Sequence, residues 1–547
     1  VTIPGGGYIV VAKDAARLRS NHPALGAGAV VGDYQGKLAN GGERVALARP
    51  SDPSSPLANL IVVDEVAYGD GGRWGQWADG GGSSLELVDA RSDNRLPANW
   101  AVSDETAKSA WVAVEHTGVL DLGTDVYGVD RLQVLLMGEG ECLIDDVQVI
   151  GPNGNNLVPN STFEQGAQGW RARGTHARSS LETTEGYRSG KSFRLRASGR
   201  GSTDANHVFI DLTGSLTPGT YATLRARARW CRGNPELLLR LRGNHLEAAG
   251  RLPVPLAAGT PGARNSTARA NTGPAIWDVK HSPILPAIGQ SVLVTARVHD
   301  PDGLLAVECL YRIDPSSQTT RLAMRDDGTG GDVLGGDGLY SAMLPPQTTT
   351  NLIAFTVEAS DAAATRAISR YPVDSPEREC LVRWGEQTAV GNLGTYRIWM
   401  TRATLSEWET REPSSNDPLP VTFVYGHERV VYEASALYSG SPFHWGGYDS
   451  PMGLNCNYVL LFPKDDRFLG ATDFVLNLPA NLGSDRSAQR EQFFFAMARA
   501  IGRPHACRRF CHLIVNGLVR GPIFEDAQQP NRDYVEQWFP DDAEGEL

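Results

Sequence analysis

A chain of 547 residues is too long for one hydrophobic core, and domains of about 100 to 200 residues predict three to five of them. The 60 glycines, 33 prolines and only 8% aromatic residues favour many short strands joined by tight turns. A net charge of −12 without a long Lys/Arg block argues against a phosphate backbone as partner. We therefore predict a mainly β protein that does not bind nucleic acid.

Two further features bound the class of protein. No run reaches the about 18 apolar residues of a membrane span, so none is predicted. The seven cysteines lie far apart, none in a zinc-type cluster, and their odd number leaves at least one unpaired within the chain. Disulfide pairing is left open. Because the sequence opens at Val1, with neither an initiator methionine nor a signal peptide, we expect a fragment.

Residues 1–111 alternate short apolar runs with glycine-rich turns, which predicts a first β-sandwich. The runs have strand length and lie at residues 7–12, 42–48, 60–63 and 84–88. The same segments, with residues 38–43, Trp74 and Trp77, resemble a bacterial lamin-tail domain of the extracellular kind. The resemblance implies an immunoglobulin-like sandwich on a secreted or cell-surface protein. It also implies that the family's first strands are missing here.

Residues 112–260 are predicted to form a second sandwich. Apolar and basic residues alternate in runs such as residues 192–196 and 221–229, which places one face in a core and the other in water. Residues 156–164 with Gly169 and Trp170 resemble the carbohydrate-binding jelly rolls of secreted glycosidases. A sugar-binding or surface-polymer role is what this resemblance implies.

A boundary between the second and third modules is predicted at residues 257–274. Residues 257–274 are rich in glycine, alanine, proline, serine and threonine and are typical of a linker. Residues 275–373 then give strand-like runs around an Asp-Pro-Asp-Gly turn, which fits an immunoglobulin-like sandwich.

One loop of this third module is a candidate calcium site. Several carboxylates lie on a flexible glycine-rich stretch, and Ca²⁺ prefers six to eight oxygen ligands. The EF-hand spacing and its closing glutamate are missing, so a tight Gly/Asp turn is the alternative. The candidate ligands are Asp326, Asp327, Asp332 and Asp337.

Residues 380–547 change in character and predict an α+β domain. Strand-like runs precede one helix, expected between an N-cap at Asp485 or Ser487 and a stop at Gly502. Its apolar positions at helical spacing are Phe493, Met497, Ala500 and Ile501.

A family resemblance in this segment is carried by residues 462–470, 489–491, 500–502, 509–510, 515–517, Gly521 and residues 525–526. In their order and spacing these residues resemble the N-terminal half of a CotH (spore-coat) kinase domain. The resemblance implies a kinase-like fold, ATP, Mg²⁺ or Mn²⁺, and phosphate transfer to Ser or Thr. The family's acidic catalytic residues lie beyond Leu547, so no catalytic residue and no phosphate transfer are expected of this fragment.

The resemblance also names candidate nucleotide-binding residues. Kinase sites need a cation for the phosphates and a carboxylate to hold it. Lys464 paired with Glu491 would supply these, and Glu525 is a third candidate; a solvated turn and a plain surface helix are the alternatives. The family's usual lysine before the strand is replaced by Asn455, Cys456 or Asn457.

These features predict an extracellular or cell-surface array whose β modules bind a surface polymer, a glycan or a protein and present a CotH-like domain. One alternative is the targeting half of a secreted Ser/Thr kinase that uses ATP. The other is an inactive pseudokinase scaffold. The oligomeric state is left open by the sequence.

Overall fold

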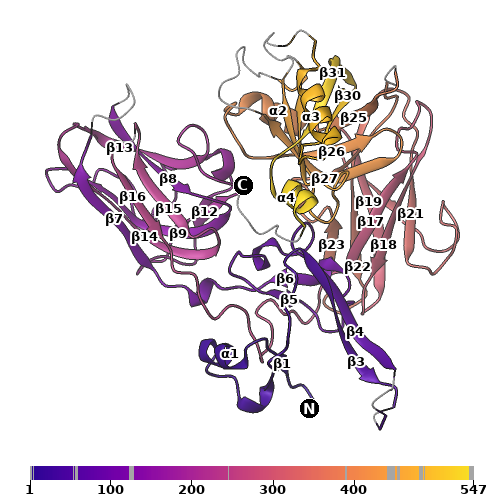
Figure 1. Cartoon of the computed structure of the whole chain (residues 1–547), viewed down its shortest axis with the longest axis horizontal. Helices are drawn as coiled ribbons and strands as arrows, with labels where there is room; N and C mark the ends of the chain where they lie inside the picture. The colour runs from indigo at the N-terminus through magenta and orange to yellow at the C-terminus, as the bar shows by residue number, and fades with distance from the viewer. Residues whose placement is uncertain are drawn as a thin grey trace. The chain divides into compact units, whose positions relative to one another are not determined.

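The computed structural model describes residues 3, 5–52, 54–55, 59–121, 128–243, 245–387, 391–439, 450–452, 456–479, 485 and 487–540. The protein is mainly β, as predicted (Figure 1). Its internal contacts define two compact units. The first comprises Val1–Ala90, Asn94–Arg269 and Ser414–Asp417, and the second Arg91–Asp93, Ala270–Pro413 and Pro418–Leu547.

The first unit opens with small sheets. β1 pairs in parallel with β2, β3 with β4 in an antiparallel ribbon, and β5 with β6. These three two-stranded sheets differ from the two packed sheets expected for residues 1–111, because side chains on both faces of the β3–β4 ribbon are exposed. The elements are β1 (Val10–Val11), α1 (Ala15–Asn21), β2 (Val30–Val31), β3 (Gly42–Pro50), β4 (Leu60–Gly69), β5 (Leu85–Leu87) and β6 (Trp100–Val102).

Two five-stranded antiparallel sheets follow in the same unit. Their orders are β10-β13-β8-β15-β16 and β11-β12-β9-β14-β7. Along β14 the predicted alternation places Leu224 in the core and Arg225 outside, and Trp170 packs on Phe163 with ring centroids 5.0 Å apart. The strands are β7 (Val112–Val119), β8 (Val129–Leu136), β9 (Gly140–Ile150), β10 (Arg171–Arg173), β11 (Ser180–Glu182), β12 (Ser192–Ala197), β13 (His207–Leu216), β14 (Tyr221–Gly233), β15 (Glu236–Leu241) and β16 (Glu247–Arg251).

The stretch predicted to be a linker is bonded to this first unit. The amide of Gly259 donates to Glu105 Oε1 at 2.6 Å, and Lys108 Nζ donates to the carbonyl of Gly259 at the same distance. Glu105 is buried. Residues 257–269 therefore pack as part of a folded unit, because small polar side chains supply hydrogen bonds where apolar burial is lacking.

The second unit begins with a three-stranded sheet, β17-β18-β21, packed on a second sheet of order β20-β19-β22-β23, in which β24 also pairs with β22. Valines of β18 alternate into a core that contains Phe355 and Trp384. The strands are β17 (Ala275–Ser282), β18 (Val292–His299), β19 (Leu304–Ile313), β20 (Thr320–Ala323), β21 (Leu339–Leu344), β22 (Leu352–Asp361), β23 (Ile368–Tyr371) and β24 (Cys380–Arg383).

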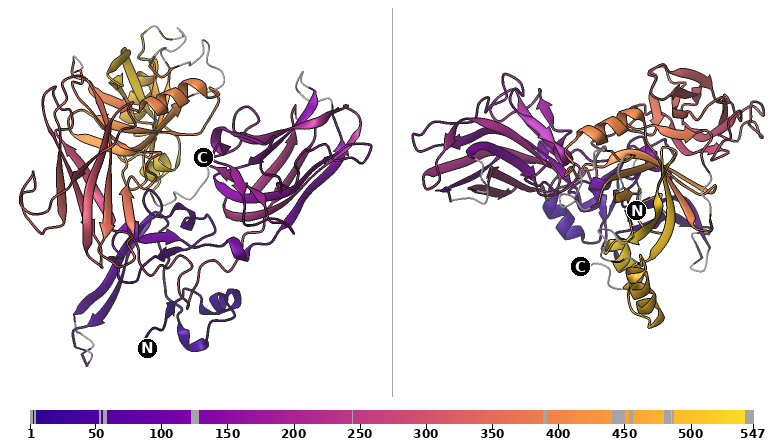
Figure 2. Two further views of the ribbon diagram at one scale, coloured as in Figure 1. Left: turned by 180° about the vertical axis from the view of Figure 1, so that it is seen from behind. Right: turned by 90° about the horizontal axis from the view of Figure 1, so that it is seen from above.

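A closed barrel completes the second unit, in the order β25-β26-β27-β28-β29-β31-β30. The parallel pairing of β25 with β30 closes it, and aromatic rings such as Phe423 and Phe468, 4.8 Å apart, fill its core. Figure 2 shows these strands from two further sides. The elements are β25 (Gly394–Trp399), α2 (Arg402–Thr410), β26 (Leu419–Tyr425), β27 (Arg429–Tyr438), β28 (Tyr458–Leu461), β29 (Asp473–Asn477), α3 (Arg490–Ala500), β30 (Arg508–Val515), β31 (Leu518–Gln528) and α4 (Arg532–Trp538).

The helix predicted near Gly502 is confirmed as α3, but its packing differs from the expected pattern. Phe493, Met497 and Ile501, which share the predicted apolar face, are exposed. Phe495 is half-buried instead, with the Arg508 guanidinium 4.8 Å from its ring centroid. Throughout the part of the chain that the structure describes, no helix combines the length and apolar character needed to cross a bilayer.

Candidate metal site

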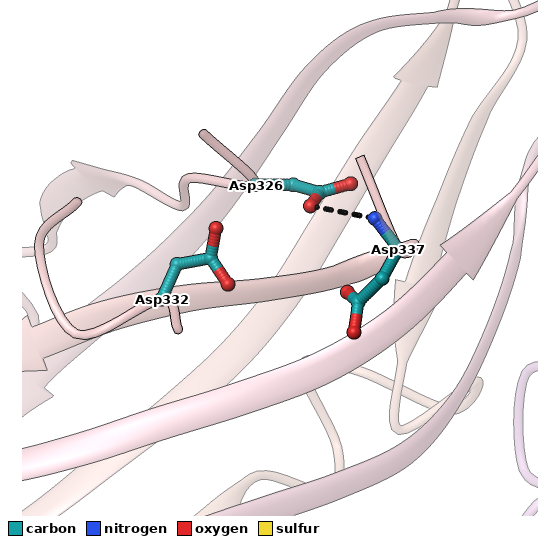
Figure 3. Close-up of side chains that lie close together, drawn as sticks. All are labelled: Asp326, Asp332 and Asp337. Carbon is teal, nitrogen blue, oxygen red and sulfur yellow. Dashed lines mark hydrogen bonds between the residues drawn. The ribbon is translucent and has the colours of Figure 1, made fainter. Parts of the chain in front are cut away.

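The loop between β20 and β21 brings three of the four predicted calcium ligands together. Arg325 and Ser341 exchange two backbone hydrogen bonds of 2.8 Å, which fix the loop where β21 begins. Beyond this bridge, carboxylate oxygens of Asp326, Asp332 and Asp337 all lie within 4.8 Å of one another (Figure 3).

Asp326 organises the end of the loop. Its Oδ1 accepts from the amides of Gly336 at 2.6 Å and Asp337 at 3.1 Å, and its Oδ2 accepts from Gly338 at 3.0 Å. Gly336 and Gly338 both have φ of +79°, a conformation that a side chain would strain. The glycines that the sequence places between the acids therefore let successive amides point at one carboxylate.

The other two acids are also held by backbone amides. Asp332 accepts from Gly328 at 2.6 Å and from Leu334 at 3.3 Å, and Asp337 accepts from Leu339 at 2.9 Å. A carboxylate oxygen has two lone pairs, so each of these bonds leaves acceptor capacity. The three carboxylates are thus positioned by the loop itself.

Asp327 does not join the group. Its Oδ1 accepts from the Thr329 amide at 3.0 Å and from the Thr329 hydroxyl at 2.5 Å, and its Oδ2 lies 3.5 Å from Arg325. The hydrogen bond from the Thr329 hydroxyl is the largest cause that lowers the pKa of Asp327. Asp327 therefore lies outside the group formed by the other three carboxylates.

The arrangement suits a hard cation. Three carboxylates within 4.8 Å repel one another, and a divalent ion between them would offset that repulsion. Oxygen ligands alone favour Ca²⁺ or Mg²⁺, and Ca²⁺ tolerates the irregular geometry of such a loop better. Carbonyl groups or water would have to complete its six to eight ligands.

The predicted nucleotide-binding residues lie on the barrel. Glu491, in the first turn of α3, pairs with Arg508, and Arg508 also pairs with Glu525 at 3.1 Å. Gln492 donates to Glu525 at 2.7 Å, and burial raises the pKa of Glu525. The structure therefore brings Glu491 and Glu525 together around one arginine.

Lys464 lies in the turn after β28, where its carbonyl accepts from Arg467 at 3.2 Å. Its expected pairing with Glu491 stays a prediction. Of the positions that replace the family's lysine, Cys456 is buried, Asn457 accepts from the Leu478 amide at 2.9 Å, and Asn455 lies outside the described residues.

Sequence reasoning missed the polar cluster beside this site. Asp526 is fully buried, accepts a hydrogen bond from the Tyr396 hydroxyl and pairs with Arg509 at 2.7 Å. Burial, followed by the charge of Asp526, raises the pKa of Tyr396 far above its usual range. Arg509 on β30 lies directly opposite Asp526 on β31, and the adjacent basic pair 508–509 and acidic pair 525–526 would have been the signal.

Comparisons with known proteins add little to this geometry. No protein-family model matches the chain, and no curated protein matches it. Among solved structures, it is similar to a DUF4785 family protein from Legionella pneumophila subsp. pneumophila, with 7% identity and a TM-score of 0.15 over 61% of this chain and 76% of that one. A TM-score that low carries no argument about fold or function, so the functional case rests on the residues described above.

Proposed function

We propose that this chain is an extracellular or cell-surface binding array in which one β module holds Ca²⁺ between Asp326, Asp332 and Asp337. The observation that carries the proposal is the convergence of these three carboxylates on a loop of a β module. Calcium-binding modules outside cells bind the ion weakly, with dissociation constants of about 10⁻⁴ to 10⁻³ M.

The array is supported by the separate cores of its β modules. One core fills the two five-stranded sheets of the first unit, and others fill the sandwich and the barrel of the second. Together with the lamin-tail-like and carbohydrate-binding-like sequence features, these cores favour a protein that presents binding surfaces to a glycan, a surface polymer or a protein. The CotH-like segment would be the domain that is presented.

Calcium binding can be tested with variants from the same loop. We expect Ca²⁺ titrated into the full chain to give saturable heat in isothermal calorimetry and to raise the melting temperature. Asp337→Asn and Asp332→Asn should each weaken binding about tenfold or more, because each removes one carboxylate charge. Asp327→Asn is the matched control and should bind as the wild type does.

No saturable response below about 10 mM Ca²⁺ would overturn the calcium proposal, since that exceeds the range of extracellular modules. An equal loss of binding in Asp327→Asn would overturn the assignment of ligands. Glycan-array binding with and without Ca²⁺ would then test the array itself.

A second candidate function is an atypical Ser/Thr kinase or its inactive relative. It is favoured by the meeting of Glu491 and Glu525 at Arg508, two of the three predicted nucleotide-binding residues. Metal-dependent ATP binding that Lys464→Ala weakens would support a nucleotide site. Unchanged binding in that variant would remove Lys464 from it.

A further inference from the structure

The β3–β4 ribbon has an open edge. Every residue from Glu43 to Pro50 is exposed, including Val45 and Leu47 at 42% and 64%. β3 pairs with β4 on one side, and among the described strands it has no second partner (Figure 1). A long exposed edge with apolar side chains is a ready template for a further strand.

The backbone of β3 is regular enough to pair with a further strand along its open edge. The extra residue of the ribbon lies on β4, where Val63 is skipped because Leu47 faces Asp64 and Ala48 faces Val62. At the end of the ribbon the Ser51 amide donates to Asn59 at 2.8 Å. Since such bonds alternate along an antiparallel strand, the N–H and C=O groups of Arg44, Ala46 and Ala48 point to the open edge.

The side chains of β3 are arranged symmetrically about Ala46. Glu43 lies three positions before it and Arg49 three after, while Val45 and Leu47 flank it. Arg49 has no ion-pair partner within the described part of the chain. Glu43 accepts one hydrogen bond from the Ala39 amide at 3.1 Å, which leaves its other carboxylate oxygen available.

We infer that β3 pairs antiparallel with β3 of a second copy of this chain, about a two-fold axis at Ala46, to form a four-stranded sheet. In this register Glu43 of each copy faces Arg49 of the other, and Val45 faces Leu47. Both are pairs without direct hydrogen bonds, in which opposite side chains approach most closely.

Charge selects this edge and this register. A two-fold pairing of β4 about one of its central acids would place Asp64 opposite Asp64 of the copy, or Glu65 opposite Glu65, which is repulsive. The basic residue on the other face of β3, Arg44, already pairs with Glu65 of its own ribbon. A two-fold contact is closed, so it produces dimers and not filaments.

The experiment measures association of the full chain by sedimentation velocity from about 1 to 200 µM, the range in which weak dimers form. We expect a monomer–dimer equilibrium. Glu43→Arg and Arg49→Glu should each raise the dimer dissociation constant about tenfold or more, because each turns two attractive pairs into two repulsive ones. The double variant Glu43→Arg with Arg49→Glu restores both pairs and should dimerise like the wild type. Arg200→Glu, at another exposed position, controls for net charge.

Three outcomes would overturn the inference. These are a wild type that stays monomeric over that range, a dimer that the single reversals leave intact, and species that grow without limit, which would indicate open-ended pairing. Ala46→Pro gives an independent check, because proline is tolerated on an edge strand but removes the amide at the two-fold axis. A dimer that persists in this variant would also contradict the pairing.

Discussion

Ser266 donates its hydroxyl to Oε2 of Glu86 over 2.8 Å, and the two residues lie 180 positions apart in the chain. Glu86 is buried on β5, and its carboxylate also accepts from the Thr260 hydroxyl at 2.7 Å and the Thr267 amide at 3.2 Å. One carboxylate therefore anchors a segment whose composition is that of a flexible linker.

Replacing this anchor should release the segment. Glu86→Ala removes the shared acceptor of four donors, which are the hydroxyls of Thr260, Ser266 and Thr267 and the Thr267 amide. We expect it to destabilise the local fold by about 1 to 3 kcal/mol. Limited proteolysis followed by mass spectrometry should then show faster cleavage within residues 257–269 than in the wild type. Glu115→Ala, an exposed glutamate on β7, is the control and should cleave at the wild-type rate. Equal rates in all three proteins would contradict the anchoring role.

The linker shows why composition alone misleads. Small polar residues cannot build a hydrophobic core, which is why their composition predicts a linker. Their hydroxyls and amides nevertheless bond readily to a buried carboxylate. The carboxylate, Glu86, is 180 positions away from Ser266 in the chain, so the local sequence pattern does not predict the contact. The acidic loop was predictable because Asp326, Asp332 and Asp337 and the glycines that orient them all lie within the thirteen residues 326–338.

Helix α3 also has one feature that the local sequence predicts and one that depends on the tertiary fold. Its existence follows from local signals, but its N-cap is Gln489 and not Asp485 or Ser487 as predicted. Asp485 still accepts from the amide of Arg490, the first helical residue, at 2.8 Å. The orientation of α3 does not follow from local signals. The expected apolar face with Phe493 is exposed, whereas Phe495 lies against Arg508 of β30, a contact that only the tertiary fold decides.

Acid should weaken the sandwich of the second unit through His281. Its Nε2–H donates to the Ile284 carbonyl at 3.0 Å and its Nδ1 accepts from the Tyr432 hydroxyl, so the ring is held neutral. Burial lowers the pKa of His281 to about 4. The unfolded histidine protonates near 6.5, so the unfolding free energy should fall by up to about 1.4 kcal/mol per pH unit between 6.5 and 4. Calorimetry at pH 7.5 and 5.0 should show a smaller loss of melting temperature for His281→Gln than for the wild type. The same loss in both would exclude His281 as the titrating group.

Asp473 should have the opposite pH dependence. Burial, followed by the charge of Asp533, raises the pKa of Asp473 to about 6. The folded state then binds more protons between pH 3.8 and 6, so its stability falls as pH rises through that window. Asp473→Asn keeps the acceptor for Asn531 and removes the charge, which should stabilise the barrel at pH 7.5. Partial exposure screens the charge, so we expect a gain of about 1 kcal/mol.

The control for this prediction is Asp533→Asn. Asp533 accepts from the Thr472 amide at 2.6 Å and from its hydroxyl, and pairs with Arg467, so the same substitution there should destabilise the barrel. Denaturant unfolding of both variants at pH 7.5 and 4.5 distinguishes them. A destabilised Asp473→Asn at pH 7.5 would mean that its negative charge is favourable in the folded protein.

Glu386, which precedes β25, and Arg397, on β25, form a buried ion pair whose loss should strongly lower the free energy of unfolding. Glu386 has no exposed side-chain surface and Arg397 has 2%, with Nε and Oε2 3.5 Å apart; Trp399 Nε1 also donates to Glu386 at 3.0 Å. Removing one charge of a buried pair leaves the other uncompensated, which costs about 3 to 5 kcal/mol. We therefore expect Glu386→Gln to lower the free energy of unfolding of the second unit by that amount. Arg383 also pairs with Glu386, at 3.3 Å, but its side chain is 16% exposed. Because Arg397→Met removes the more deeply buried of the two charges left unpaired, the double variant should be less destabilised than the sum of the two single variants in denaturant titrations. Additive losses, or a loss below about 1 kcal/mol for Glu386→Gln, would show that water screens this pair and that it behaves as a surface ion pair.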